Sequence, residues 1–268
     1  MSELLSPRNP KVAQARELAR DRGARESLGL AVLEGVRLAE EAVAAGVTID
    51  YALYTEDLAR KERGAALLSA LAAAGVAQHA VTADTLARAA DTQAPQGILA
   101  VFRPRPWRLE QMPAGLVVVL DNLQDPGNLG TIIRSLEALG GAGLALAGGV
   151  DPYNPKVVRA AMGSLFRLPV VGGGDIGPVL TDLKRQGRRI LVADAGGELM
   201  PWTAGLAGNV ALVIGNEGNG PSDTARQLAD GIISIPMEGP TESLNAGVAA
   251  SLLIYEAMRQ RVGRPGSP

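Results

Sequence analysis

From residue 115 onward, short apolar runs of strand length alternate with amphipathic segments of helix length. The run over residues 116–120 is continuously apolar, as expected of a strand that is buried on both faces. Further strands are predicted at 143–147, 168–171, 190–193, 210–214 and 232–235, and helices at 128–139, 154–165, 178–186, 221–229 and 245–261. This alternation predicts an α/β fold with a mainly parallel sheet and helices on both faces. Ligands of such sheets bind at the carboxyl ends of strands, so the loops after residues 120, 193, 214 and 235 are the candidate binding loops.

Residues 1–102 show a shorter pattern of the same α/β kind. Helices are predicted at 10–22, 34–45, 56–74 and 83–90, and strands at 29–33, 51–54 and 76–81. Two prolines then fall within residues 103–108 and favour an extended chain. We therefore predict a domain over residues 1–102, a linker over 103–114 and a second domain over 115–268.

The composition excludes several kinds of catalytic site. The chain of 268 residues has no cysteine and one histidine, His79, so a thiolate nucleophile, a Ser-His-Asp triad and a histidine-rich metal site are all excluded within one chain. His79 lies in a predicted strand and is interpreted as structural, and no metal is expected. No apolar run approaches the roughly 18 residues that a membrane helix needs. The N-terminus lacks a secretory signal, so we expect a cytoplasmic protein with no membrane partner.

One glycine motif imitates a dinucleotide-binding site. Gly172, Gly174 and Gly177 fit the pattern G-x-G-x-x-G, and Asp194 ends the next strand, near where an acid that binds a ribose would lie. The preceding strand is short and contains Pro169, which cannot donate a ladder hydrogen bond. The motif also falls in the middle of its domain. A loop is the preferred interpretation, and an NAD-binding enzyme is the alternative.

Two of the candidate loops combine glycine or a helix start with polar side chains. In the first, over residues 125–135, Asn128 is the predicted helix cap and Arg134 follows one to two turns later, an arrangement that suits phosphate recognition. In the second, Gly215, Gly218 and Gly220 surround Glu217 directly after a buried strand. Glycines at this spacing let the backbone approach a ligand closely.

The third loop follows the predicted strand 232–235 and precedes the last helix. It contains the string Ile235-Pro236-Met237 and, before the helix, Ser243-Leu244-Asn245. Either Ser243 or Asn245 is of a residue type that caps helices. Capping accounts for one of these residues but not for the whole polar string.

In order, the three loops contain Asn-x-Gly-x-x-x-Arg, Gly-x-Glu-Gly-x-Gly, and Ile-Pro-Met followed by Ser-Leu-Asn. These strings resemble the signature motifs of the SpoU/TrmH family of RNA 2′-O-ribose methyltransferases, which belongs to the SPOUT superfamily. Residues 6–11 and 33–37 are more weakly similar to the family's substrate-binding domain. The resemblance implies a deep trefoil knot in the C-terminal domain, a smaller ribosomal-protein-like N-terminal domain that binds RNA, and a homodimer formed through the C-terminal domain.

The resemblance also implies S-adenosyl-L-methionine as the cofactor. Its predicted binding residues are Gly215, Ile235, Met237 and Leu244, and the predicted catalytic residues on the acceptor side are Arg134, Asn128, Glu217, Ser243 and Asn245. Two roles for the arginine stay open: activation of the ribose hydroxyl, or a phosphate clamp that stabilises the developing alkoxide. The pKa of a guanidinium lies above 12, which favours the clamp. A binding protein without catalytic activity is a further alternative.

Basic residues crowd one stretch of the N-terminal half: Arg8, Lys11, Arg16, Arg20, Arg22 and Arg25. The first five are the predicted RNA-binding residues, and an ordinary solvated helix face is the competing interpretation. The resemblance favours ribosomal RNA, of the large subunit in particular, with tRNA as the alternative. The last helix is apolar on almost every side, which independently favours burial at a homodimer interface.

Overall fold

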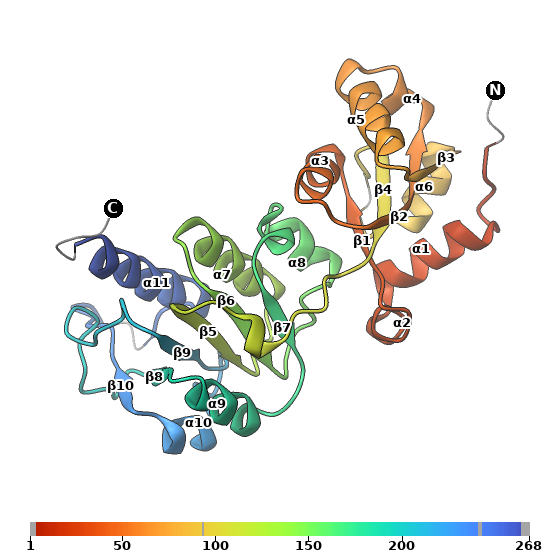
Figure 1. The fold of residues 1–268 in the computed structure, drawn as a ribbon. Helices are drawn as coiled ribbons and strands as arrows, with labels where there is room; N and C mark the ends of the chain where they lie inside the picture. The colour runs from red at the N-terminus through yellow and green to blue at the C-terminus, as the bar shows by residue number, and fades with distance from the viewer. Residues whose placement is uncertain (1–3, 93, 241–242, 264–268) are drawn as a thin grey trace. The chain divides into compact units, whose positions relative to one another are not determined.

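The computed structural model describes residues 4–92, 94–240 and 243–263, and the chain divides into two compact units (Figure 1). The first unit extends from the N-terminus to Arg105 and includes the later segment Tyr153–Phe166. The second unit comprises Pro106–Pro152 and the chain from Arg167 onward. No feature of the sequence indicated that Tyr153–Phe166 belongs to the first unit.

The first unit contains a four-stranded sheet of order β1-β4-β2-β3. β2 and β3 are parallel, whereas β4 is antiparallel to both β1 and β2. The strands are β1 (Ala31–Glu34), β2 (Ile49–Thr55), β3 (Ala77–Val81) and β4 (Ile98–Phe102). The helices are α1 (Pro10–Arg20), α2 (Arg22–Leu28), α3 (Val36–Ala44), α4 (Glu56–Ala59), α5 (Glu62–Ala73), α6 (Ala83–Ala89) and α8 (Pro155–Ala160), followed by the 3-10 turn η2 (Ser164–Phe166).

Both faces of this sheet are covered. α1 and α6 pack together over one face, and α3 and α5 lie on the other (Figure 1). The core under α1 includes Leu18, Leu53 and Leu99, all at most 1% exposed. On the opposite face, Phe102 meets the ring of Phe166 edge to face, with 5.5 Å between centroids. The segment Tyr153–Phe166 therefore completes the core of the first unit.

Two of the predicted N-terminal helices are divided in the structure. The predicted helix 10–22 breaks at Asp21, because the Asp21 carboxylate accepts from the Ala24 amide and starts α2. The predicted helix 56–74 is interrupted between α4 and α5. His79 lies in β3, as predicted, and its ring packs edge to face on Tyr51. Burial, together with the nearby positive charge of Lys11, lowers the pKa of His79, which suits an uncharged structural side chain.

The second unit contains a six-stranded parallel sheet of order β10-β8-β9-β5-β6-β7, as the alternation predicted. Its strands are β5 (Leu116–Asp121), β6 (Gly143–Ala147), β7 (Val170–Gly172), β8 (Arg189–Ala193), β9 (Val210–Ile214) and β10 (Gly231–Ile233). Its helices are α7 (Pro126–Ala138), α9 (Ile176–Arg185), α10 (Asp223–Leu228) and α11 (Ala246–Val262), and the 3-10 turn η1 (Leu109–Gln111) precedes β5.

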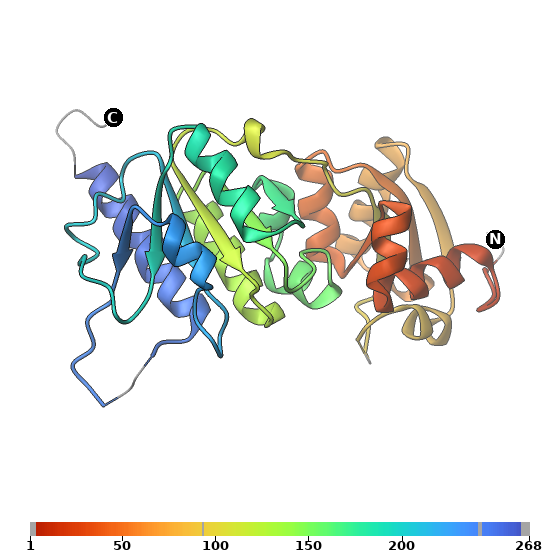
Figure 2. The same ribbon diagram turned by 90° about the horizontal axis from the view of Figure 1, so that it is seen from below.

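The helices of this unit form two layers. α7 and α11 lie side by side on one face of the sheet, and α9 and α10 lie together on the other (Figures 1 and 2). The central strands β5 and β9 are buried along their whole length, which explains their continuous apolar sequences. Gly173 and Gly174 form a loop with φ of +94° and +89° after the edge strand β7, as the loop interpretation of that motif predicted.

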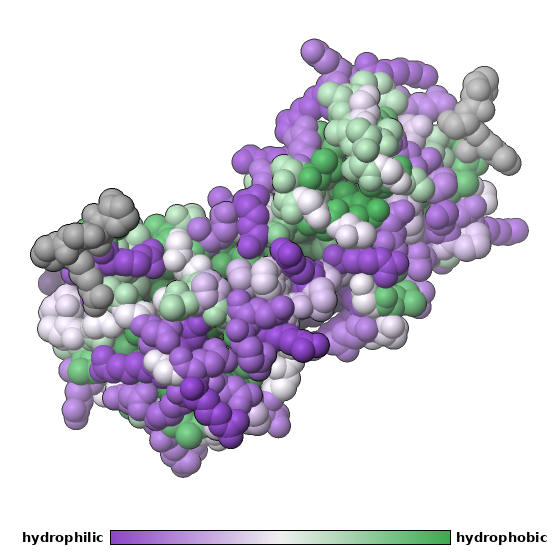
Figure 3. Space-filling model, in the orientation of Figure 1, coloured by the Kyte–Doolittle hydropathy of each residue, from purple (hydrophilic) through white to green (hydrophobic). Residues whose placement is uncertain are grey.

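Hydrophilic residues cover most of the face drawn in Figure 3, and a hydrophobic area lies over the first unit near α3 and α5. Within the described residues, no helix combines the length and the hydropathy needed to cross a bilayer. The same part of the chain holds no cluster of three or more side chains suited to bind a metal ion.

Candidate active site

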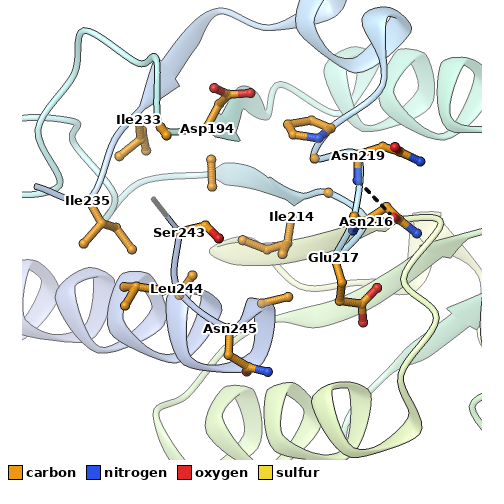
Figure 4. Close-up of a pocket in the computed structure, with 18 of the residues that line it drawn as sticks. Asp194, Ile214, Asn216, Glu217, Asn219, Ile233, Ile235, Ser243, Leu244 and Asn245 are labelled. Carbon is orange, nitrogen blue, oxygen red and sulfur yellow. Dashed lines mark hydrogen bonds between the residues drawn. The ribbon is translucent and has the colours of Figure 1, made fainter. Parts of the chain in front are cut away.

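A cavity of about 510 Å³ opens at the carboxyl ends of β8, β9 and β10 (Figure 4). The three loops that follow these strands line it, together with the start of α11. Of the predicted site residues, seven line this cavity: Gly215, Glu217, Ile235, Met237, Ser243, Leu244 and Asn245. The structure therefore brings the second and third candidate loops together around one pocket.

The loop after β9 is held in a tight turn by its own backbone. Asn216 and Gly220 exchange backbone hydrogen bonds of 3.0 and 2.9 Å, and the Asn216 side chain accepts from the Gly218 amide at 2.8 Å. The Asn216 amide group also donates to the carbonyl of Asn122 at 2.9 Å, which ties the loop to the end of β5. The result is a fixed wall of backbone on one side of the pocket.

Gly215 is required by this turn itself. A Cβ at this position would stand 2.1 Å from the nitrogen of Pro221 and 2.2 Å from the carbonyl carbon of Gly220. Sequence reasoning explains this glycine by the approach of a ligand to the backbone. In the structure, the nearest obstacle to a side chain is instead the chain's own backbone.

Glu217 connects the loop over residues 215–220, called the glycine loop below, to the start of α7. Its carboxylate accepts from the side chain of Asn128 at 3.0 Å and from the backbone amides of Asp125 and Gln124 at 3.0 and 3.1 Å. Partial burial raises the pKa of Glu217, but the hydrogen bond from Asn128 and those from backbone amides outweigh it and hold the pKa below its ordinary value. Glu217 is therefore an ionised hydrogen-bond acceptor.

The cap of α7 differs from the prediction. Asp125, not Asn128, is the N-cap residue, and its carboxylate accepts from the Asn128 amide at 2.7 Å. Pro126 occupies the first helical position, where its missing N–H is harmless, so the helix starts two residues earlier than predicted. This leaves the Asn128 side chain free to donate to Glu217.

The third loop ends at the cap of α11. Asn245 is the N-cap, and its side chain accepts from the Val248 amide at 3.2 Å, which settles the choice left open between Ser243 and Asn245. The Ser243 hydroxyl faces the pocket in Figure 4. Behind the cap, a Cβ on Gly247 would lie 3.2 Å from the Asn128 side chain, so α11 starts close against α7.

Arg134 does not line the pocket. It lies on α7 with its side chain exposed. The next residue, Ser135, lies on the side of α7 that meets α11, where its hydroxyl is hydrogen bonded to that of Ser251 at 2.7 Å. The structure thus separates the first motif: Asn128 joins the glycine loop, and Arg134 faces solvent.

The five predicted RNA-binding residues differ in their surroundings. Arg8, Arg16 and Arg20 are exposed. Lys11 is half-buried with its ammonium 4.6 Å from the centroid of the Tyr51 ring, and Arg22 pairs with Glu26 at 2.7 Å. Arg25, from the same basic stretch, is buried and donates to the Leu18 carbonyl, so it does not belong to this surface.

Three charged residues in and around the pocket are absent from the predicted site, although the dinucleotide-like motif singles out one of them, Asp194. Asp121, buried at the end of β5, accepts from the Ser222 amide at 2.7 Å and so fixes the start of α10. Asp194, at the end of β8, lines the pocket and pairs with Arg226 of α10 at 2.7 Å. A carboxylate directly after an apolar strand is the signal that marks both aspartates, whereas no local signal marks Arg226.

The second unit is a parallel α/β domain with a pocket at the carboxyl ends of its strands, which is where such domains bind nucleotides and related ligands. The glycine loop, the Ile-Pro-Met segment and the capped start of the last helix line this pocket. Residues 115–255 match the model of the SpoU rRNA Methylase family, and residues 9–100 match that of the MRM3-like substrate binding domain. The chain therefore belongs to the SpoU rRNA methylase family.

Two relatives and a solved structure resemble nearly the whole chain. An uncharacterized tRNA/rRNA methyltransferase of Synechocystis is 34% identical, covering 97% of this chain and 95% of the relative. The 23S rRNA (uridine(2479)-2′-O)-methyltransferase of Streptomyces viridochromogenes is also 34% identical, over 96% and 92% of the two chains. The crystal structure of the SpoU methyltransferase AviRb from the same organism, in complex with AdoMet, has a TM-score of 0.89 at 33% identity and covers 96% of this chain and 99% of its own.

Proposed function

We propose that the chain transfers the methyl group of S-adenosylmethionine to a ribose 2′-hydroxyl of ribosomal RNA, with the large subunit favoured over tRNA. The observation that carries this proposal is the pocket in which the second and third motifs meet, in a chain of the SpoU rRNA methylase family. The name of the Streptomyces relative supports both the 2′-hydroxyl and the 23S rRNA. Such a role belongs in the cytoplasm and needs no metal.

The decisive experiment is methyl transfer to purified RNA. The protein would be incubated with methyl-labelled S-adenosylmethionine and unmodified transcripts of large-subunit rRNA, small-subunit rRNA and tRNA. We expect label in the large-subunit rRNA, at a nucleotide that becomes resistant to alkaline hydrolysis because its 2′-hydroxyl is blocked. Label in tRNA alone would overturn the choice of substrate, and RNA binding without transfer would favour the noncatalytic alternative.

The pocket residues fit the cofactor in chemical type. Gly215 contributes backbone to the pocket wall, and Ile235, Met237 and Leu244 contribute apolar side chains, which suits the adenosine and the aliphatic part of the cofactor. Bound S-adenosylmethionine supplies an electrophilic methyl group. The protein's contribution is to hold this group in line with the acceptor hydroxyl.

Different tasks are proposed for the residues on the acceptor side. Glu217 and Asn128 position the glycine loop, because their hydrogen bonds are to each other and to the start of α7. Asn245 fixes the start of α11. Ser243 offers a hydroxyl at the pocket wall, and Arg134 clamps a substrate phosphate and stabilises the developing alkoxide. Activation of the hydroxyl by Arg134 is the alternative, and the guanidinium pKa disfavours it.

A homodimer through the C-terminal domain is part of the proposal. α11 buries one side against α7, with Ala250, Leu253 and Ile254 at most 1% exposed. Its other side presents large apolar side chains to solvent: Val248, Leu252, Tyr255 and Val262, which are 47, 47, 53 and 67% exposed. A helix with two apolar sides requires a second cover, and a copy of the same chain provides it. Arg134 lies on the helix beside this face.

Replacing Leu252 with aspartate should therefore convert the protein to a monomer at micromolar concentration. A carboxylate at the centre of an apolar interface is desolvated without a partner, which costs several kcal/mol. Light scattering after size exclusion would measure the mass. Leu28→Asp, at a 44% exposed leucine of the first unit, is the matched control and should leave the mass unchanged. A wild-type protein that is monomeric would contradict the proposal.

A trefoil knot in the second unit is proposed from the family resemblance. The pocket loops after β8, β9 and β10 lie together, and the chain passes from them directly into α11, which packs on α7. This arrangement supports a last helix that is threaded beneath an earlier loop.

RNA recognition is proposed for the N-terminal half, through the exposed basic residues of α1 and of the segment just before it, Arg8, Arg16 and Arg20.

Reversing the charge of two of these residues, in the double variant Arg16→Glu with Arg20→Glu, should weaken RNA binding at least about tenfold. The slope of log Kd against log salt should fall by about 1–2, because phosphate contacts are lost. Filter binding across a salt series measures both. Arg60→Glu with Arg185→Glu changes the net charge equally at exposed arginines outside α1 and should have little effect. Equal losses in both double variants would favour a merely solvated helix face.

A further inference from the structure

Asp194 and Arg226 form a charged pair at the wall of the pocket that the proposed mechanism does not use. Asp194 follows directly after β8, beside the glycine loop that follows β9. Figure 4 places Asp194 and Ile233 on the side of the pocket opposite Leu244 and Asn245. Both Asp194 and Arg226 belong to the lining of the cavity.

The carboxylate of Asp194 is held in place by three hydrogen bonds and can accept one more. Its Oδ2 accepts from Nη2 and Nε of Arg226 at 2.7 and 3.2 Å, and its Oδ1 accepts from the Gly196 amide at 2.9 Å. A carboxylate has about four acceptor positions, so one remains on Oδ1. The side chain is 22% exposed, which leaves room for a ligand to reach it.

Arg226 also ties Asp194 to the glycine loop. Its Nη1 donates to the carbonyl of Pro221 at 2.5 Å, while Nη2 and Nε hold the carboxylate. The hydrogen bond from Gly196 and the one from Arg226 lower the pKa of Asp194 and outweigh its partial burial, so the group is ionised at neutral pH. Because Arg226 balances this charge, the pair suits a neutral hydroxyl better than a second cation.

We propose that Asp194 accepts a hydrogen bond from a ribose hydroxyl of bound S-adenosylmethionine, and that Arg226 is the residue that positions its carboxylate. The inference rests on the proposed function, because it requires this cofactor in the pocket. An adenosine ribose brings two hydroxyl donors, and an acid at the end of a parallel strand is a suitable partner for them. Of the lining residues that the structure describes, Glu217 is the other carboxylate, and its hydrogen bonds are to the start of α7.

The test is a thermodynamic cycle between the protein and the ligand, measured by isothermal titration calorimetry. S-adenosylhomocysteine and its 2′-deoxy and 3′-deoxy analogues are titrated into the wild-type protein and into Asp194→Ala. We expect the wild-type protein to bind one deoxy analogue about tenfold more weakly than the parent ligand. Asp194→Ala should bind the parent about tenfold more weakly and lose nothing further with that analogue, because the interaction is already absent.

Two further variants separate a direct contact from a structural effect. Asp194→Asn keeps an acceptor oxygen and should recover part of the discrimination between the ligands. Arg226→Gln should reduce this discrimination, whereas a purely structural arginine would lower the affinity for all three ligands equally. The two losses are independent if Asp194→Ala binds the deoxy analogue about tenfold more weakly again than it binds the parent ligand. In that case Asp194 does not contact the ribose, and the inference is wrong.

The amino-acid end of the cofactor is the competing partner for Asp194. If Asp194→Ala weakens S-adenosylhomocysteine but not 5′-methylthioadenosine, which keeps the ribose and lacks the amino acid, the carboxylate faces the ammonium group and the inference is overturned. A wild-type protein that binds none of the ligands would instead contradict the proposed function.

Discussion

Replacing Arg134 with alanine should lower the methylation rate at least about a hundredfold, the loss typical of removing one donor to a developing negative charge. The affinity for S-adenosylhomocysteine should change less than about tenfold, or roughly 1.4 kcal/mol, because Arg134 lies outside the lining of the pocket. Arg134→Lys keeps the charge but not the planar pair of donors, so it should recover little activity. Single-turnover methylation and calorimetry measure the two quantities separately.

Arg185→Ala is the control for this variant, since Arg185 is an exposed arginine at the end of α9 whose ion pair with Asp182 lies in solvent. It should retain full activity. Light scattering on Arg134→Ala would exclude loss of the proposed dimer as the cause. Full turnover by Arg134→Ala would remove Arg134 from the catalytic machinery.

The second large effect is expected from a single methyl group at Gly215. In Gly215→Ala the new Cβ would collide with the backbone of Gly220 and Pro221, so the glycine loop must move. We expect the affinity for S-adenosylhomocysteine to fall at least about a hundredfold, or 2.7 kcal/mol, because the moved backbone forms a wall of the pocket. Calorimetry measures the affinity, and a thermal melt shows whether the unit stays folded.

Gly218→Ala provides a matched control within the same loop. A Cβ on Gly218 would meet only the Asn216 side chain at 3.5 Å, an ordinary contact, and the backbone there does not have a positive φ. This variant should bind the ligand within a few-fold of the wild-type protein. Similar losses in both variants would mean that the loop tolerates no added side chain and that the collision at Gly215 is not the cause.

The sequence predicted the parallel sheet well, because its central strands β5, β6 and β9 are buried along their whole length and have largely unbroken apolar runs. It did not predict β4, whose five apolar residues adjoin the linker, since a short apolar run does not distinguish a strand from part of a helix. The helix predicted over 10–22 is divided because the Asp21 side chain caps a second helix. Composition and hydrophobic periodicity do not reveal a cap inside a helical pattern.

The motif residues around the pocket were recognisable, but their separate tasks were not. Asn128 was predicted to cap a helix and instead bonds to Glu217, 89 residues later in the chain. The pair of Asp194 and Arg226 spans 32 residues and depends on the packing of α10 beside β8. Interactions at such separations follow from the tertiary fold, and no local pattern encodes them.

The core of the first unit depends on a segment that the ribosome makes late. Phe102 cannot meet Phe166 until Tyr153–Phe166 has left the exit tunnel, so the N-terminal half cannot finish folding as soon as its own sheet is synthesised. At about 5–20 residues per second, the intervening stretch takes several seconds to make. During that time the part of this sheet face around Phe102, which Phe166 later covers, stays exposed, and it is the part of the nascent chain where we expect chaperones to bind.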